Sequence, residues 1–197
     1  MSEQIAFIGD IHGEIQALDR ALQSMEGRKI DQYVFLGDYI NRGKFSKGVI
    51  ERLIEFREKH ECVFIRGNHD QLMLDALADA DSVGAFLKIG GAETLQSYLS
   101  GRKIGSDVFT ELHSLVPESH KQFLKSTVKD WESTSIYAAH RGPVDPNRVT
   151  ILGHWFVNRV DLQSKIIKID TGCGMPNGKL TVLIAPSFEV KHFAARV

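Results

Sequence analysis

Short apolar runs alternate with segments of helical periodicity over the first third of the chain. Apolar residues recur at helical spacing from Ile15 to Met25 and again from Val49 to Phe56. The runs around these segments are short and apolar and end at a glycine, so they are predicted to be buried strands: Ile5–Gly9, Tyr33–Gly37 and Cys62–Gly67. This β-α-β-α-β pattern predicts parallel strands with helices packed on the sheet.

The middle of the chain, from Gln71 to about residue 130, is predicted to be mostly helical and is interrupted by glycines at 90–91 and 101–105. In the last third, strand-like apolar runs are separated by short turns, and they cover 135–140, 148–154, 165–172, 179–186 and 189–195. There is no repeat, linker or low-complexity segment. The sequence therefore predicts a layered α/β fold in one domain, residues 1–197, with a helical insertion at about 71–130.

Composition is that of an ordinary globular protein. Its 197 residues are 43% hydrophobic and 25% charged, which is enough apolar material for a core. The formal net charge of -1 leaves no global field to attract nucleic acid or an anionic membrane. No apolar run approaches the roughly 20 residues that span a bilayer, and the N-terminus, MSEQIAFIGD, lacks a signal-peptide pattern. Cys62 and Cys173 have no paired-cysteine spacing, so we expect a buried thiol at Cys62 and a reducing, cytoplasmic location.

Polar residues follow the carboxyl end of each predicted strand in the first third. They form the segments GDIHG at 9–13, GDYINRG at 37–43 and GNHD at 67–70. Ligands bind at that edge of an open α/β sheet, and carboxylate, imidazole and carboxamide groups suit a divalent cation. One such segment alone is usually a turn or a helix cap, but three in succession, each after a strand, indicate a metal site.

The ordered motifs resemble the metallophosphoesterases, and in particular the bacterial branch of the phosphoprotein phosphatase family. That family's signature has the form GD-x-HG, then GD-x-x-DRG, then GNH-E or GNH-D. The later segments GGAETLQSYL, AAHRG, LGH, IDTGC and GKL extend the likeness over nearly the whole chain. The resemblance implies that the layered α/β fold is a β-sandwich flanked by helices.

The resemblance also implies a binuclear metal centre. Asp10 and His12 would bind the first metal and Asp38 would bridge both, while the second metal would be completed by Asn68, His140 and His154. Taken alone, each of the last two histidines is more often a core residue. Two cations would clamp an in-line displacement in which a bridging hydroxide attacks the phosphorus directly. Manganese is the expected metal, and iron, zinc, cobalt or nickel also suit these ligands.

Further residues are expected to act on the substrate. His69 would be the general acid at the leaving oxygen, and Arg42 and Asn68 would bind the phosphate. Asn41 departs from the family pattern, which has an aspartate that orients the catalytic histidine and keeps it protonated. We therefore expect lower activity, because an asparagine exerts no upward push on the pKa of His69. The asparagine fits either a natural slower variant or an altered, trapped form.

Two other departures follow the AAHRG motif. The segment between AAHRG and LGH is short, whereas in the family it is long and carries a further phosphate-binding arginine. Arg141 and Arg148 could replace that arginine, although both also fit solvated loop residues. Trp155 stands where the family has a small or polar residue, and we expect it to pack in the core with Phe156 rather than to form an apolar wall beside the substrate.

The resemblance predicts hydrolysis of phosphomonoesters, with phosphoserine or phosphothreonine in protein as the expected substrate. The first alternative is symmetrical cleavage of diadenosine tetraphosphate, which a related bacterial branch with a longer chain performs. The second is a weakly active phosphate-binding protein, and Asn41 is its only support. The expected partner is a phosphorylated protein or a small phosphoester or nucleotide, and neither nucleic acid nor a membrane.

Overall fold

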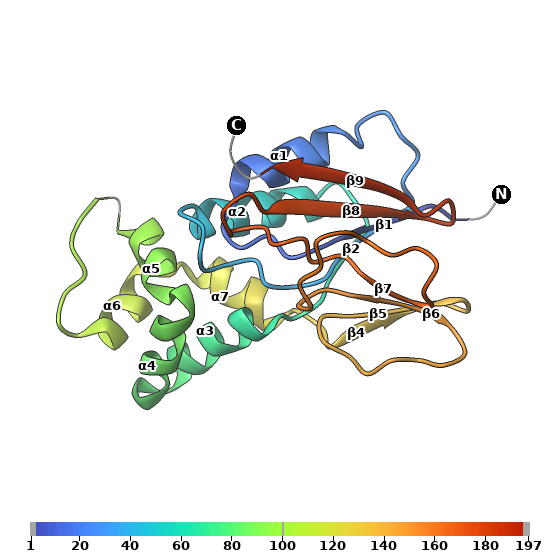
Figure 1. The fold of residues 1–197 in the computed structure, drawn as a ribbon. Helices are drawn as coiled ribbons and strands as arrows, with labels where there is room; N and C mark the ends of the chain where they lie inside the picture. Colours follow the sequence, from blue (N-terminus) through green and yellow to red (C-terminus); the bar gives the residue numbers. More distant parts are fainter. Residues whose placement is uncertain (1–2, 100, 195–197) are drawn as a thin grey trace.

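Two β-sheets stack on each other at the centre of the protein (Figure 1). The structure is a computed structural model, and it describes residues 3–99 and 101–194. The first sheet has the order β3-β2-β1-β8-β9, with bounds β1 Ile5–Ile8, β2 Gln32–Phe35, β3 Cys62–Phe64, β8 Lys179–Ala185 and β9 Glu189–Ala194. β1, β2 and β3 are parallel as predicted, whereas the β8–β9 hairpin joins β1 antiparallel.

The second sheet has the order β4-β5-β6-β7, with bounds β4 Asp130–Glu132, β5 Ile136–Ala139, β6 Val149–Leu152 and β7 Ile166–Lys168. β5, β6 and β7 are parallel, and β4 pairs antiparallel with β5. Sequence analysis missed β4, because Asp-Trp-Glu is too short and too polar to show a strand period.

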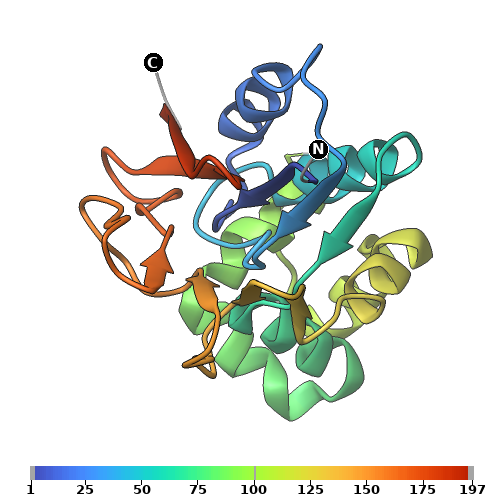
Figure 2. The ribbon, with the colours of Figure 1, turned by 90° about the vertical axis from the view of Figure 1, so that its right-hand side faces the viewer.

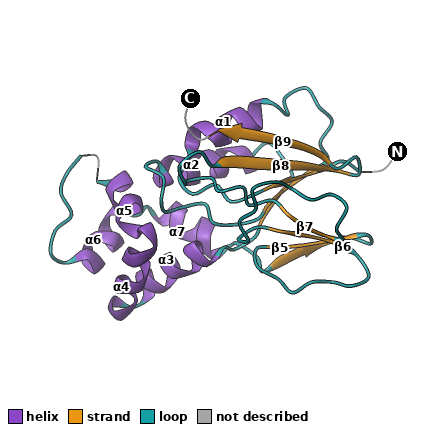
Figure 3. Ribbon diagram, viewed as in Figure 1, coloured by secondary structure: helices purple, strands orange, loops and turns teal. Residues whose placement is uncertain are grey.

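Helices cover the outer face of the first sheet and one end of the sandwich. α1 (Ile15–Gln23) and α2 (Ser46–Arg57) lie on the side of the first sheet that faces away from the second sheet (Figure 2). The other helices gather at one end of the two sheets (Figure 3), and they are α3 Asn68–Ala78, α4 Val83–Phe86, α5 Ala92–Tyr98, α6 Val108–Leu115 and α7 Glu118–Lys125. They occupy the region predicted to be helical. No helix among the described residues is long and apolar enough to cross a bilayer.

β1 is buried on both faces, which explains its uninterrupted apolar sequence. Ala6 and Ile8 pack with the helices in one core, and Ile5 and Phe7 pack in a second core between the sheets. The prediction of a layered α/β fold with two sheets flanked by helices is therefore confirmed.

Candidate metal centre

The loops that follow five strands converge on one site. Parallel strands end at the same edge of their sheet, so the residues after β1, β2 and β3 meet there, and the stacked sheet adds those after β5 and β6. These loops carry the six predicted metal ligands: Asp10, His12, Asp38, Asn68, His140 and His154. All are buried except Asn68 and His154, which are half-buried.

Asp38 lies at the middle of the cluster. Its Oδ2 atom is 3.6 Å from Nε2 of His12, 3.8 Å from Nε2 of His69 and 3.5 Å from Nε2 of His140. The ligand atoms form two sets that share this carboxylate: one contains His12 and His69, and the other contains His140 and His154. Within each set the atoms lie within 4.8 Å of one another, which is the arrangement that a bridging carboxylate requires.

Asp10 is held between the two sheets. The backbone N–H of His154 donates to Oδ1 and Oδ2 of Asp10 at 3.1 and 3.2 Å, and Oδ2 is 3.9 Å from Nε2 of His12. Burial, together with the carboxylates of Asp170 and Asp38, raises the pKa of Asp10 well above its ordinary value. Buried carboxylates that repel one another are strongly favoured by a cation among them.

The imidazole orientations fit metal ligation. Nδ1 of His12 is 3.0 Å from the carbonyl oxygen of Ile40, and Nδ1 of His140 is 2.8 Å from that of Leu36. A carbonyl only accepts, so Nδ1 carries the proton and Nε2 presents a lone pair to the cluster. Nε2 of His12 is buried and has no hydrogen-bond partner. Nε2 of His140 faces Oδ1 of Asn68, another acceptor, at 3.1 Å. A cation bound at each set of ligands would satisfy these lone pairs, so the residues fit divalent metal ions.

Electrostatics oppose protonation of His12 and Asp38. Burial and the positive charges of Arg42 and His69 lower the pKa of His12 to about 3, because together they outweigh the attraction of Asp38. Burial would raise the pKa of Asp38, but His140, His12 and His69 hold it below its ordinary value. An ionised Asp38 and a neutral His12 are the forms that bind metal.

The backbone at the site adopts the left-handed region that L-residues rarely occupy. Among the described residues, five of the seven non-glycine residues with positive φ are predicted site residues: His12 (46°), Asp38 (53°), Asn41 (72°), Arg42 (62°) and His154 (56°). Each such residue costs on the order of 1–3 kcal/mol, and such strain clusters at functional sites. Strained left-handed backbone conformations therefore occur at the residues whose side chains are predicted to form the site.

Asp70 ties two of the loops together, and sequence analysis missed this role. Its Oδ2 accepts from the backbone N–H groups of Asp38 and Gly67, both at 2.8 Å, and its Oδ1 accepts from that of Tyr39 at 3.0 Å. The N–H of His69 donates in turn to Oδ1 of Asp38 at 2.9 Å. A Cβ at Gly67 would overlap the Asp38 carboxylate, so the loops meet only with glycine there. An acid three residues after Gly67, at the helix start, was the available signal.

Asn41 contacts the predicted general acid. Its Nδ2 is 3.0 Å from Nδ1 of His69, and its Oδ1 accepts from the hydroxyl of Thr94 at 2.7 Å. The Thr94 hydroxyl also accepts from the backbone N–H of Asn41 at 2.8 Å. Thr94 lies in α5, within the GGAETLQSYL segment, and was not singled out from sequence. The insertion thus fixes the residue that orients His69.

The two loop arginines are placed differently. Arg141 follows His140, is exposed and lies 5.8 Å from the Trp155 ring centroid. Arg148 precedes β6, whereas His154 follows it, so the structure does not bring Arg148 to the cluster. Its guanidinium pairs with Asp145 at 2.7 Å and Glu132 at 2.8 Å. The substrate-binding prediction for Arg148 is therefore withdrawn.

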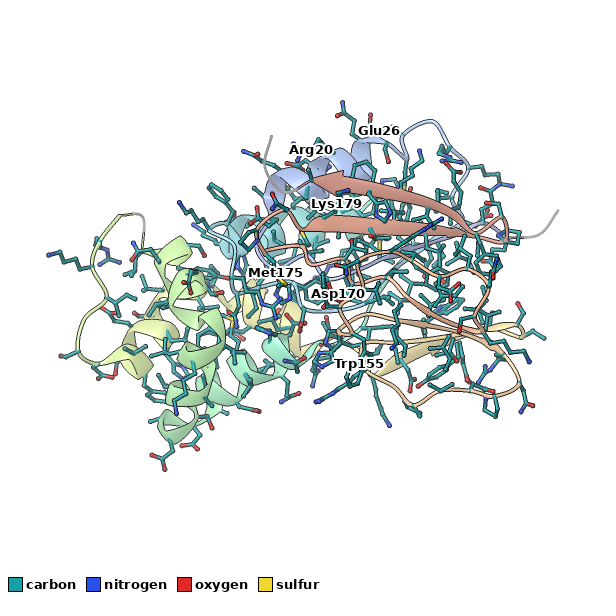
Figure 4. The ribbon with its side chains drawn as sticks, viewed as in Figure 1. Arg20, Glu26, Trp155, Asp170, Met175 and Lys179 are labelled. Carbon is teal, nitrogen blue, oxygen red and sulfur yellow. The ribbon has the colours of Figure 1, made fainter. Side chains whose placement is uncertain are left out.

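Two expectations about burial were wrong. Trp155 is 42% exposed and Phe156 is 52% exposed, so neither packs in the core. The Trp155 ring instead lies against His154, with the centroids 5.0 Å apart. Figure 4 places Trp155, Asp170 and Met175 where the strands meet the helices. Cys62 is only half-buried, and burial nevertheless raises the pKa of its thiol to about 12.

Comparison with known proteins identifies the family. The family model for calcineurin-like phosphoesterases matches residues 4–168, so the chain belongs to that family of metallophosphoesterases. The resemblance stated from the motifs is therefore confirmed, and the family is metal-dependent.

Individual relatives are more distant. The chain is 38% identical over 72 residues to the Serine/threonine-protein phosphatase PP2A-like PPG1 of Candida albicans, which is 36% of this chain and 17% of that protein. It is 31% identical over 68 residues to a serine/threonine-protein phosphatase 4 catalytic subunit of Eremothecium gossypii, which is 34% of this chain and 22% of that one. The chain thus spans only about a fifth of these relatives.

Solved structures support the fold over the whole chain. A crystal structure assigned provisionally as a diadenosine tetraphosphatase has a TM-score of 0.70 at 17% identity, and the match covers 98% of this chain and 94% of that one. A cold-active protein-tyrosine phosphatase of a Shewanella species has a TM-score of 0.60 at 13% identity, with 98% and 81% covered. At such identities the likeness concerns the fold alone.

Proposed function

We propose that this protein hydrolyses phosphomonoesters with two divalent metal ions, preferentially manganese, and that its substrates are phosphoserine or phosphothreonine residues of cytoplasmic proteins. The observation that carries the proposal is the position of Asp38, whose carboxylate is shared by two sets of imidazoles. The partial matches to serine/threonine phosphatases support this substrate class.

The chain's residues have distinct tasks in this proposal. Asp10 and His12 would hold one metal, Asp38 both metals, and Asn68, His140 and His154 the other. When bound, the metals would make water acidic enough to attack phosphorus and would neutralise phosphate charge. Arg42 would bind non-bridging phosphate oxygens through its planar guanidinium.

His69 would protonate the leaving oxygen. Its Nε2 faces the cluster, 3.8 Å from Asp38, while Asn41 holds Nδ1 from behind. Asn41 holds Nδ1, so Nε2 is the ring nitrogen that faces the leaving oxygen, and a protonated His69 would give its Nε2 proton to that oxygen and become a neutral imidazole.

The test joins metal analysis to a substrate panel. Metal-free protein is loaded with manganese, and bound metal is counted by mass spectrometry. Hydrolysis is then measured on para-nitrophenyl phosphate, a phosphoserine peptide, a phosphotyrosine peptide and diadenosine tetraphosphate. We expect two metals per chain and the highest kcat/KM on the phosphoserine peptide, with both metal content and activity reduced in Asp38→Asn. A folded protein that binds no metal contradicts the centre, and a higher kcat/KM on the dinucleotide contradicts the substrate class.

A further inference from the structure

A cleft of about 410 Å³ opens directly beside the predicted metal centre. Two of its lining residues, Asn68 and His140, are predicted metal ligands, so a phosphate bound to the metals would lie beside the cleft. The rest of the wall comes from α3 and from the segments that follow β3, α7 and β5: Arg66, Gly67, Gln71, Thr127, Val128, Lys129, Arg141 and Gly142. This space is large enough for more than a single phosphate group.

The cleft carries positive charge that the protein does not neutralise. Arg66 is fully engaged, because its guanidinium donates to three carbonyl oxygens of the 124–127 segment and to the side chains of Thr127 and Gln71. Lys129 and Arg141 are exposed, and no carboxylate of the described residues lies within ion-pair distance of either. No aspartate or glutamate is among the described residues that line the cleft. Two cations therefore face a cavity without an anion.

We propose that Lys129 and Arg141 bind a second anionic group of the substrate, a few bonds from the phosphate that is hydrolysed. This inference rests on the proposed function, because the metal centre fixes where the first phosphate lies. An acidic side chain next to a phosphoserine supplies such a group, and so does the phosphate chain of a nucleotide. The peptide is favoured, because none of the described residues that line the cleft is a phenylalanine, tyrosine or tryptophan that could stack on a nucleobase.

Both cations are exposed, so solvent weakens each contact below that of a buried charged hydrogen bond. We expect each to contribute roughly threefold to tenfold in kcat/KM for a doubly anionic substrate. The preference should shrink when salt is raised from about 0.05 to 0.5 M, because the Debye length then shortens.

The experiment compares two phosphoserine peptides that differ only in glutamate or glutamine beside the phosphoserine. Each is hydrolysed by the manganese-loaded parent, by Lys129→Gln/Arg141→Gln, and by the matched control Arg102→Gln/Lys103→Gln, which removes the same two charges from an exposed loop. We expect a preference of about tenfold for the glutamate peptide in the parent and the control. The ratio should fall to near one in the cleft variant.

Other outcomes are equally decisive. Loss of diadenosine tetraphosphate hydrolysis in the cleft variant, with an unchanged peptide ratio, would assign the second anion to a nucleotide. Unchanged ratios for both substrates would overturn the proposal. If the parent hydrolyses no phosphoester, the proposed function has failed, and calorimetry on the manganese-loaded protein still judges the cleft. The proposed role of Lys129 and Arg141 is supported if the parent binds pyrophosphate more tightly than phosphate and the cleft variant loses this difference. It is rejected if the parent binds the two anions equally.

Discussion

Nδ2 of Asn41 lies 3.0 Å from Nδ1 of His69, at the position from which a carboxylate would charge the imidazole. Thr94 completes the arrangement by donating its hydroxyl to Oδ1 of Asn41 at 2.7 Å. The amide thus reproduces the orientation of the ring but supplies no negative charge. The framework for a catalytic histidine is in place, and only its electrostatic support differs from the family pattern.

Replacing Asn41 by aspartate should therefore raise turnover. The new carboxylate would accept from a protonated Nδ1 of His69 and still accept from Thr94, which makes His69 a stronger source of the proton for the leaving group. General acid catalysis is worth about 10²–10⁴-fold in rate. We expect the kcat of Asn41→Asp to be at least roughly tenfold higher than that of the parent. The measurement is para-nitrophenyl phosphate hydrolysis with manganese.

Metal content provides the control for this variant. Among the described residues, Asn41 makes no hydrogen bond to the six predicted ligands, so Asn41→Asp should bind as much manganese as the parent. Asn41→Ala, which loses the contact with Nδ1, should be slower than the parent. If Asn41→Asp is no faster than the parent on any phosphoester, the residue at position 41 does not influence the acidity of His69.

The convergence of the predicted ligands on one site was predictable because their context is simple. Asp10, Asp38 and Asn68 each follow an apolar run that is buried on both sides, and parallel strands end at one edge. Trp155 was not predictable in this way. β6 ends at Leu152, before the tryptophan, and the ring lies on His154 between the cations of Arg141 and Lys168. Hydrophobicity alone does not predict that the Trp155 ring lies at the surface against His154 rather than in the core.

The role of Asp70 depends on three-dimensional geometry in the same way. Two of its three hydrogen bonds join loops that are separated by about thirty positions in the sequence, and left-handed turns bring their N–H groups together. From sequence, an acid in the first turn of a helix indicates only a cap. Contacts of this kind become visible when the strand register is known.

Asp70→Asn should destabilise the manganese-loaded protein by about 1–3 kcal/mol. The amide has one oxygen for three buried N–H donors, so its NH₂ group must face at least one of them: the N–H of Gly67, Asp38 or Tyr39. Urea unfolding measures the change. Asp75→Asn on the same helix is the matched control, since among the described residues the Asp75 carboxylate accepts only from the exposed side chain of Gln71, and a change within about 0.5 kcal/mol is expected there. Equal stabilities of the two variants would contradict the role of Asp70.

Metal-free protein should lose stability as the pH rises from 7.5 to 9. Burial and the neighbouring Asp38 raise the pKa of Asp70 from 3.8 to about 8, and burial raises that of Asp10 as well. The folded state then binds more protons than the unfolded state, so stability falls as these groups ionise. The lowered pKa values of His12, His69, His120, His154 and His192 act in the opposite direction, until the unfolded imidazoles have lost their protons about one pH unit above 6.5. Above about pH 7.5 the raised pKa values therefore decide the direction of the change.

The expected loss from Asp70 is about 1 kcal/mol over this interval, and Asp10 changes stability in the same direction. Urea unfolding in a chelator, at the two pH values, measures it. Manganese-loaded protein is the comparison, because ligated carboxylates are already ionised and the loss should disappear. A metal-free protein that becomes more stable as the pH rises would contradict the raised pKa values.

Arg141 and Arg148 provide the last test, because they are chemically alike and differently placed. Arg141→Ala should raise the Michaelis constant for a phosphoserine peptide with a neighbouring glutamate roughly threefold to tenfold, because its exposed guanidinium lines the cleft beside His140. Arg148→Ala should leave that constant unchanged, because Arg148 is bound to Asp145 and Glu132 before β6 begins. Steady-state kinetics at low salt measures both. If neither substitution changes the Michaelis constant, Arg141 does not contact the substrate. If only Arg148→Ala raises it, β6 does not separate Arg148 from the site.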